Sequence, residues 1–201
     1  SVVGSANADT VAISSTTGST YTLAGGDDRM TGSVADLVAT GATDNIINGG
    51  DGDDRITLDD AAVTLTDNHF TQLSSIEELV ITASTGATSV TSGGSFNAAF
   101  ANGASITQGA HADGTAVTYS MGLSNVDTTI ALTSAGLLNA AGENLSVTTG
   151  SGADTVTVAA AAFVGVTGAA SSVMAINTAA GNDAITFSYS TLVSNNTAGG
   201  I

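Results

Sequence analysis

A short motif recurs along this chain: a glycine-rich turn, an aspartate, one further residue and then an aliphatic side chain. Glycine adopts backbone conformations that other residues avoid, so it favours tight turns, and the aliphatic residue is suited to a strand. The motif occurs at Asp9-Thr10-Val11, Asp28-Arg29-Met30, Asp44-Asn45-Ile46, Asp54-Arg55-Ile56, Asp154-Thr155-Val156 and Asp183-Ala184-Ile185. Successive aspartates in this series are 19, 16 and 10 residues apart up to Asp54, and the last two are 29 apart. These steps lie near multiples of nine, the period of the nonapeptide β-helix repeat.

Short pairs of apolar residues separated by one residue, often threonine, supply the expected strands. Both members of such a pair point to one face of a strand, and the residue between them points to the other face. The pairs are Val11/Ile13, Tyr21/Leu23, Ile56/Leu58, Val63/Leu65, Leu79/Ile81, Val117/Tyr119, Ile130/Leu132, Leu145/Val147, Val156/Val158, Val164/Val166, Met174/Ile176 and Ile185/Phe187. Their close spacing predicts an all-β fold, a parallel β-solenoid or β-roll. Short helical inserts are expected in residues 68–78, 95–102 and 134–142.

The composition agrees with a thin β architecture. The chain has only five Phe, three Tyr and no Trp, and its mean hydropathy is +0.31. Most of its apolar residues are small or β-branched, which suits a pleated sheet better than a thick helical core. We expect two parts of one elongated unit, residues 1–85 and a Thr/Ala-rich β-solenoid continuation in residues 86–201.

The charge balance excludes several functions. The chain has 18 acidic residues, only two basic ones (Arg29 and Arg55) and a net charge of −16. It lacks the basic surface that nucleic acids require, and anionic membrane surfaces would repel it. No stretch predicts a membrane-spanning helix, so no membrane insertion is expected. The absence of cysteine rules out disulfides and zinc–thiolate sites.

Residues 49–57, Gly-Gly-Asp-Gly-Asp-Asp-Arg-Ile-Thr, match the calcium-binding nonapeptide G-G-x-G-x-D-x-U-x at every fixed position. Glycines permit a partly left-handed turn and leave carbonyl oxygens free for a cation, and Ca²⁺ takes six to eight oxygen ligands. The predicted calcium ligands and turn residues are Asp9, Asp28, Asp44, Gly49, Gly50, Asp51, Gly52, Asp53, Asp54, Gly152 and Asp154. The alternative is that these are ordinary Asx-rich turns, which we expect for Asp183.

These motifs resemble the RTX-type calcium-binding proteins and, within them, the surface-layer (S-layer) proteins of Gram-negative bacteria. The nonapeptide at 49–57 carries the RTX resemblance, and a following segment, Phe70 to Ile81, resembles the coil that comes after such turns. The resemblance covers residues 1–85 by motif, so we expect these residues to form the calcium-binding, RTX-like part, and it covers the rest only by composition. It implies type I secretion through a signal outside this fragment, a calcium-stabilised solenoid and lateral self-assembly. The nonapeptides here are isolated rather than in tandem.

The leading hypothesis is therefore a structural protein, a self-assembling building block of a bacterial surface layer or filament outside the cell. Its expected partner is itself, with cell-surface polysaccharide as a second candidate. The alternative function is a calcium-binding spacer or adhesion module of a large type I-secreted RTX adhesin. We expect no enzyme, because the only histidines, His69 and His111, lie in turn-like segments without a recognisable catalytic partner.

Overall fold

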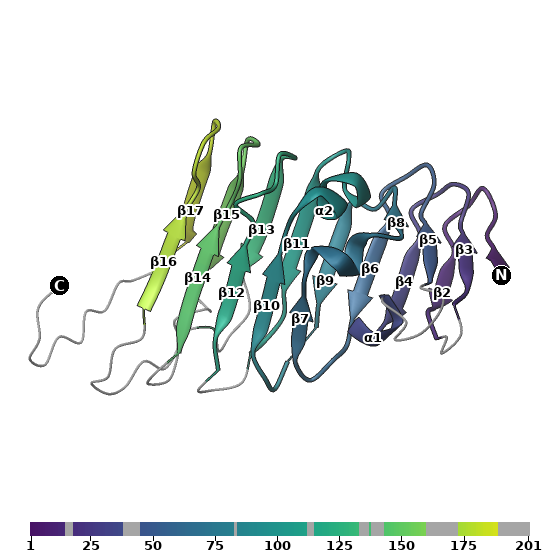
Figure 1. The fold of residues 1–201 in the computed structure, drawn as a ribbon, viewed down its shortest axis with the longest axis horizontal. Coiled ribbons are helices and arrows are strands. Elements are labelled where there is room, and N and C mark those ends of the chain that lie inside the picture. Colours follow the sequence, from purple (N-terminus) through teal and green to yellow (C-terminus); the bar gives the residue numbers. More distant parts are fainter. Residues whose placement is uncertain are drawn as a thin grey trace, which may run out of the picture.

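The computed structural model describes residues 1–14, 18–37, 45–82, 84–111, 115–132, 137, 143–159 and 173–188. Within them the chain winds as a parallel β-solenoid, with the N-terminal coils at one end of the long axis and the C-terminal coils at the other (Figure 1). The predicted all-β solenoid is therefore confirmed. None of the described helices is long and apolar enough to span a membrane.

One layer of the solenoid is a single parallel sheet of eight strands, one from each coil. In chain order they are β2 (Thr10–Ala12), β4 (Arg29–Gly32), β6 (Arg55–Leu58), β9 (Glu78–Ile81), β11 (Ala104–Gln108), β13 (Thr128–Leu132), β15 (Thr155–Ala159) and β17 (Ala184–Ser188). This sheet runs through both the acidic first third of the chain and the nearly neutral remainder.

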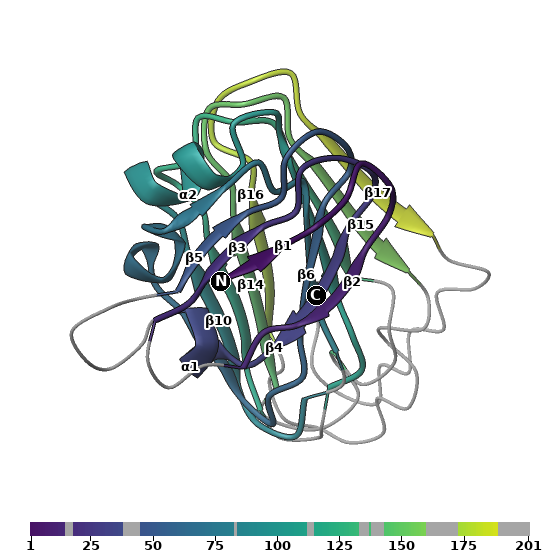
Figure 2. The ribbon, with the colours of Figure 1, turned by 90° about the vertical axis from the view of Figure 1, so that its right-hand side faces the viewer.

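Opposite it lie two shorter parallel sheets, seen with the eight-stranded sheet in the end-on view of Figure 2. The four-stranded sheet contains β1 (Val2–Val3), β3 (Thr20–Thr22), β5 (Ile46–Asn48) and β8 (Leu73–Ser74). The five-stranded sheet contains β7 (Val63–Leu65), β10 (Thr88–Thr91), β12 (Val117–Ser120), β14 (Asn144–Thr148) and β16 (Val173–Asn177).

The length of a coil differs from the predicted period. Thr10 is in register with Arg29, 19 residues further on, but Arg29 pairs with Arg55 after 26 residues and Thr155 with Ala184 after 29. Nine residues are therefore not the repeat of the coil, and that interpretation of the spacings is wrong. The connections between the strands differ in length from coil to coil.

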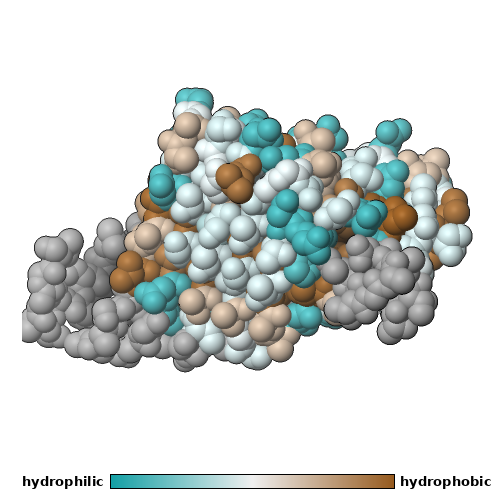
Figure 3. Space-filling model, in the orientation of Figure 1, coloured by the Kyte–Doolittle hydropathy of each residue, from teal (hydrophilic) through white to brown (hydrophobic). Residues whose placement is uncertain are grey.

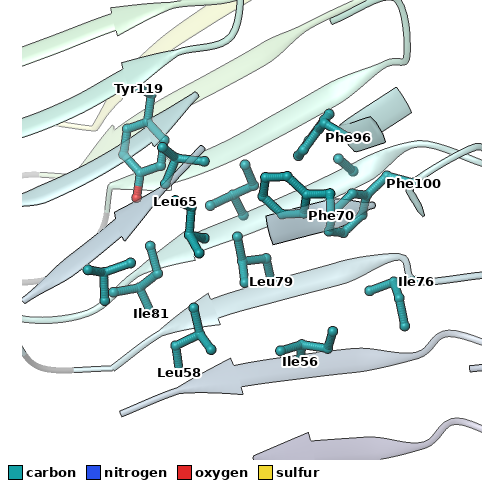
Figure 4. Packing of buried hydrophobic residues seen from close by; sticks show 14 of the residues in the cluster. Ile56, Leu58, Leu65, Phe70, Ile76, Leu79, Ile81, Phe96, Phe100 and Tyr119 are labelled. Atoms are coloured by element: carbon teal, nitrogen blue, oxygen red, sulfur yellow. The ribbon is translucent and has the colours of Figure 1, made fainter. Parts of the chain in front are cut away.

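Strand alternation places the predicted apolar pairs in one continuous core between the layers. Ile56, Leu58, Leu79 and Ile81 are at most 1% exposed and stack on neighbouring strands of the eight-stranded sheet (Figure 4). The pair in β17 differs, because Ile185 and Phe187 are 42% and 40% exposed. This strand is at the edge of the sheet and has one neighbouring strand, β15. The pair at 164 and 166 lies outside the described residues.

Short helices occur at two of the predicted inserts. They are η1 (Asp67–Phe70) and α2 (Gly94–Ala99), and Phe70, Phe96 and Phe100 form an aromatic cluster with centroids 4.7–5.9 Å apart. The Asp67 carboxylate accepts hydrogen bonds from the first turn of α2, at Ser95 and Phe96. A further helix, α1 (Val34–Leu37), was not expected, and the insert predicted at 134–142 lies outside the described residues except for Leu137.

The outer face of the five-stranded sheet carries hydroxyl side chains. Thr64, Ser89, Thr118 and Ser146 are in register across four neighbouring strands and point away from the core. Strands β7, β10, β12, β14 and β16 contain no charged residue, and this face is mostly pale in Figure 3. The charges of the chain lie elsewhere, chiefly at the turns.

Candidate functional site

Five connections in the described part of the chain share one construction. Each is six residues long, leads into the eight-stranded sheet and ends in an aspartate immediately before the strand. The turns are residues 4–9, 23–28, 49–54, 149–154 and 178–183, and their final residues are Asp9, Asp28, Asp54, Asp154 and Asp183. They lie along the upper edge of the molecule in Figure 1. The aliphatic residue two positions after the aspartate packs in or against the core in four of these strands, at Val11, Met30, Ile56 and Val156, whereas Ile185 in β17 is 42% exposed.

Glycine is required in these turns by both backbone conformation and close approach. Gly50 and Gly52 have φ angles of +112° and +139°, in the left-handed region that favours glycine. A Cβ atom at Gly52 would lie 2.3 Å from the carbonyl oxygen of Gly26 in the preceding turn, and one at Gly50 would lie 2.3 Å from that of Ala24. The prediction of a tight, partly left-handed turn at 49–54 is confirmed.

The turn aspartates form hydrogen-bonded stacks between coils. In the first stack, the backbone N–H of Asp9 donates to Asp28 Oδ1 (2.6 Å), that of Asp28 to Asp54 Oδ1 (2.9 Å) and that of Asp54 to Glu77 Oε2 (3.0 Å). We call Asp9, Asp28, Asp54 and Glu77 the N-terminal ladder. The carboxylates of Asp28, Asp54 and Glu77 therefore each pair with a buried or half-buried amide that no strand neighbour satisfies.

A second stack follows beyond α2, and we call Asp154 and Asp183 the C-terminal ladder. The N–H of Thr128 donates to Asp154 Oδ1 (2.8 Å), and the N–H of Asp154 donates to Asp183 Oδ1 (3.0 Å). The expectation that Asp183 belongs to a plain turn misses this bond. Its turn has lost two glycines of the nonapeptide, yet its aspartate occupies the same position before the strand.

Three carboxylates in these ladders have an oxygen that is buried and unpaired. Asp28, Asp54 and Asp154 are 0% exposed, and the Oδ2 atom of each has no hydrogen-bond partner. Leaving a buried charged oxygen unpaired costs more than about 1–3 kcal/mol. Burial raises the pKa of Asp54 above its ordinary value, and the charges of Asp28 and Glu77 raise it further, although the Asp28 N–H bond opposes them. Such oxygens suit a bound cation.

The other predicted site residues are placed differently. Asp9 is half-buried, and its Oδ2 accepts the N–H of Ser5 at 2.6 Å. Asp51 and Asp53 are exposed. Gly49 lies against the unpaired oxygen, because a Cβ there would be 2.4 Å from Asp54 Oδ2. Asp44 lies outside the described residues.

Gly152 closes the C-terminal ladder's turn against the preceding coil. A Cβ atom at this position would lie 2.5 Å from the carbonyl oxygen of Val126, so the position admits only glycine without a backbone shift. Its role in the structure is close packing of turns, next to the buried Asp154.

The arrangement differs from a closed metal cage. Among the described residues, no three His, Cys, Asp or Glu side chains converge on one point. The carbonyl oxygens predicted to be free are partly used, since Ala24 O accepts the N–H of Asp51 (3.1 Å) and Asp51 O accepts that of Gly26 (2.8 Å). The carboxylates are stacked one per coil, and Asp28, Asp54 and Asp154 each have one unpaired oxygen. A cation here would need carboxylates from successive coils and water.

Sequence reasoning missed three acidic residues of this edge and assigned a fourth, Asp183, to an ordinary turn. Glu77 ends a three-residue connection without glycine, so no motif signals it. Asp27 Oδ1 accepts the N–H of Asp53 (3.1 Å), and Asp127 Oδ1 accepts the N–H of Ala153 (2.7 Å). For Asp183, the Asp-x-aliphatic pattern was a sufficient signal. The other three depend on register between coils, which the sequence does not display.

Both histidines bond a nearby threonine. His69 Nδ1 lies 3.0 Å from Thr66 Oγ1, and His111 Nδ1 lies 2.8 Å from Thr115 Oγ1. The predicted turn positions are wrong, because His69 lies in η1 and is half-buried, and His111 is 6% exposed and forms an isolated β-bridge with Ser84.

Comparisons of the chain with protein-family models, with curated proteins and with solved structures found no match.

Proposed function

We propose that this chain is a calcium-stabilised structural β-solenoid, a self-assembling building block of a bacterial surface layer or filament. The observation that carries the proposal is the buried, unpaired Oδ2 atom on each of Asp28, Asp54 and Asp154. Carboxylate oxygens are the ligands that Ca²⁺ prefers. Asp28 and Asp54 belong to neighbouring turns, and a cation between them would supply a partner to both unpaired oxygens.

The charge of the whole chain supports a cation over internal pairing. The chain has 18 acidic and two basic side chains, and the ion pair between Arg55 and Glu78 is the one ion pair formed among the described residues. The ladder aspartates therefore have no positive side chain to balance them. A bound divalent ion supplies that balance and ties successive coils together, so its binding free energy becomes folding free energy.

This coupling fits a protein that works outside the cell, and a bacterial cell surface reached by type I secretion is the proposed location. Where calcium is scarce, neighbouring carboxylates repel one another and weaken the coils. At millimolar calcium the ladders are neutralised and the solenoid becomes rigid. The proposal gives the chain a structural role and no catalytic one.

Thermal unfolding with and without calcium tests the metal. We expect millimolar CaCl₂ to raise the melting temperature above its value in chelator, and Asp54→Asn to remove most of that increase. Asp59→Asn is the matched control, because Asp59 is exposed and lies at the far end of β6. If calcium raised the melting temperature of both variants equally, the N-terminal ladder would not be the calcium site.

Electron microscopy tests the assembly. Ordered sheets or fibres that form with calcium and dissolve in chelator support a lattice or filament. Monomers that fold with calcium but never assemble would instead favour the alternative, a calcium-binding spacer of a large adhesin.

A further inference from the structure

The only two basic side chains of the chain lie side by side. Arg29 begins β4, Arg55 begins β6, and the two are directly in register on neighbouring strands. Strands in a sheet are about 4.8 Å apart, and like charges placed directly opposite each other destabilise a sheet. The chain, whose net charge is −16, thus places its two cations where they repel each other.

The two arginines differ in their partners. Arg55 forms an ion pair with Glu78, the next residue in the same row on β9. Arg29 is exposed and has no ion pair or hydrogen bond from its guanidinium to any described side chain. Its other neighbour in the row is Thr10, which carries no charge. A free guanidinium therefore stands on the outer face of the eight-stranded sheet.

Two exposed carboxylates lie beside the arginine pair in the same two coils. Asp27 and Asp53 each come two residues before an arginine, in the turns that lead into β4 and β6, and both are exposed, whereas Asp28 and Asp54 between them and the arginines are buried. They are stacked on each other, since the N–H of Asp53 donates to Asp27 Oδ1. The result is a rectangle of charge, with two carboxylates along one side and two guanidinium groups along the other.

We propose that this rectangle, Asp27, Arg29, Asp53 and Arg55, is a contact between two copies of this chain. Consider a two-fold axis that runs parallel to the stack of coils, midway between the carboxylate row and the guanidinium row. This axis places Arg29 of one copy opposite Asp27 of the other. The same axis pairs Arg55 with Asp53, and each pair occurs twice, as in any isologous interface. Because strand spacing is the same in both copies, all four pairs are in register.

Charge matching favours a second copy over an acidic polysaccharide. A polyanion laid over Arg29 and Arg55 would also contact the carboxylates of Asp27 and Asp53, which repel it. A second copy offers carboxylates to the arginines and guanidinium groups to the carboxylates at once, with Arg55 also paired with Glu78 of its own chain. The flanking residues of this face, such as Thr31 and Thr57, are small enough to allow close approach. The inference deepens the proposed self-assembly and rests on it, since calcium lowers the long-range repulsion between copies.

Charge-reversal variants of the whole chain test the contact, with self-association measured by analytical ultracentrifugation in millimolar calcium. Arg29→Asp and Asp27→Arg should each weaken self-association at least about tenfold, because each breaks two pairs and adds repulsion. The double variant Asp27→Arg/Arg29→Asp should restore association to within about threefold of wild type. Asp59→Arg, which changes the net charge as Asp27→Arg does, should leave association unchanged.

Three results would overturn the inference: a monomeric wild type, an Arg29→Asp variant that associates normally, or a double variant that stays dissociated. In the last case, loss of binding to polygalacturonate in the Arg29→Asp variant would assign the arginines to a polysaccharide instead. Melting temperatures with calcium and with chelator, measured on the same samples, separate this outcome from failure of the proposed function. If calcium still raises the melting temperature but the double variant does not regain self-association, only the proposed contact is wrong. If calcium does not raise the melting temperature at all, the proposed function is wrong.

Discussion

The two ladders reach the same geometry from unequal sequences. The turn at 49–54 satisfies every fixed position of the nonapeptide, whereas the turn at 149–154 has threonine at its first position. Yet Asp54 and Asp154 are equally buried, each accepts an amide N–H from the preceding coil, and each keeps an unpaired Oδ2. The first glycine of the nonapeptide is thus not needed for this bond.

The ladders differ in the density of their charge. The N-terminal ladder stacks four acidic residues on successive coils, and Asp28 and Asp54 both have unpaired oxygens. In the C-terminal ladder, Asp154 is followed on one side by Asp183 and on the other by Thr128, which has no charge. Calcium dependence should therefore concentrate in the N-terminal ladder, while the C-terminal ladder works mainly as a hydrogen-bonded cap.

The largest expected effect breaks the turn itself. A Cβ at Gly49 would lie 2.2 Å from the carbonyl oxygen of Ser75 and 2.4 Å from Asp54 Oδ2, so Gly49→Ala should destabilise the fold by about 2–3 kcal/mol. The position at the start of the other turn already holds Thr149, and Thr149→Gly should cost about 1 kcal/mol or less. Urea unfolding of both variants measures the difference. Equal losses would mean that the two turns pack alike.

The next largest effect is a difference between the two ladders in how much calcium stabilises the fold. At a concentration about 100 times its Kd, a ligand stabilises the folded state by about 2.7 kcal/mol. Asp54→Asn should remove most of this gain, and Asp154→Asn a smaller part, because the C-terminal ladder has one buried unpaired oxygen rather than two. Melting temperatures across a calcium titration give both values. A larger loss in Asp154→Asn would reverse the comparison.

In chelator, lowering the pH should stabilise the fold through Asp54, whereas acid denaturation destabilises a fold. Burial raises the pKa of Asp54 above its ordinary value of 3.8, so the folded state holds this proton more tightly than the unfolded chain. The resulting stability is present below 3.8 and is lost as the pH rises through the folded pKa. Lowering the pH from about 7 towards 4 should therefore raise the urea midpoint of wild type more than that of Asp54→Asn. Identical pH profiles for the two proteins would contradict the shift.

The smallest expected effect concerns the end of the C-terminal ladder. Asp183→Asn keeps an acceptor oxygen for the N–H of Asp154 but removes its charge, which should cost about 0.5–1 kcal/mol. Because Asp183 has no buried unpaired oxygen, its substitution should leave the calcium shift intact. Paired melts with calcium and chelator check both statements.

How far the sequence predicts this molecule depends on the range of the interaction. Alternation in segments such as Ile56 to Leu58 predicts a strand with one buried face, because the signal lies within the strand. The six-residue turns are equally local, and the Asp-x-aliphatic pattern is present even at Asp183. These features account for the correct fold class and for the glycine conformations at 49–54.

The register of the coils cannot be obtained in the same way. Asp54 meets Asp28 and Glu77 across 26 and 23 residues, and neither distance follows from a nine-residue repeat. The insertion of α2 between the ladders and the pairing of Arg29 with Arg55 depend on the same long-range packing. Unpaired oxygens emerge only from that arrangement, because the partner of each Oδ1 must be known first.

The most direct measurement is a crystal structure of the chain grown in millimolar calcium, with anomalous diffraction recorded to locate the ion. The account predicts an anomalous peak at the N-terminal ladder, about 2.3–2.6 Å from the Oδ2 atom of Asp28 or Asp54. A well-ordered ladder without a peak, in which those oxygens bond to water or to protein donors instead, would contradict it.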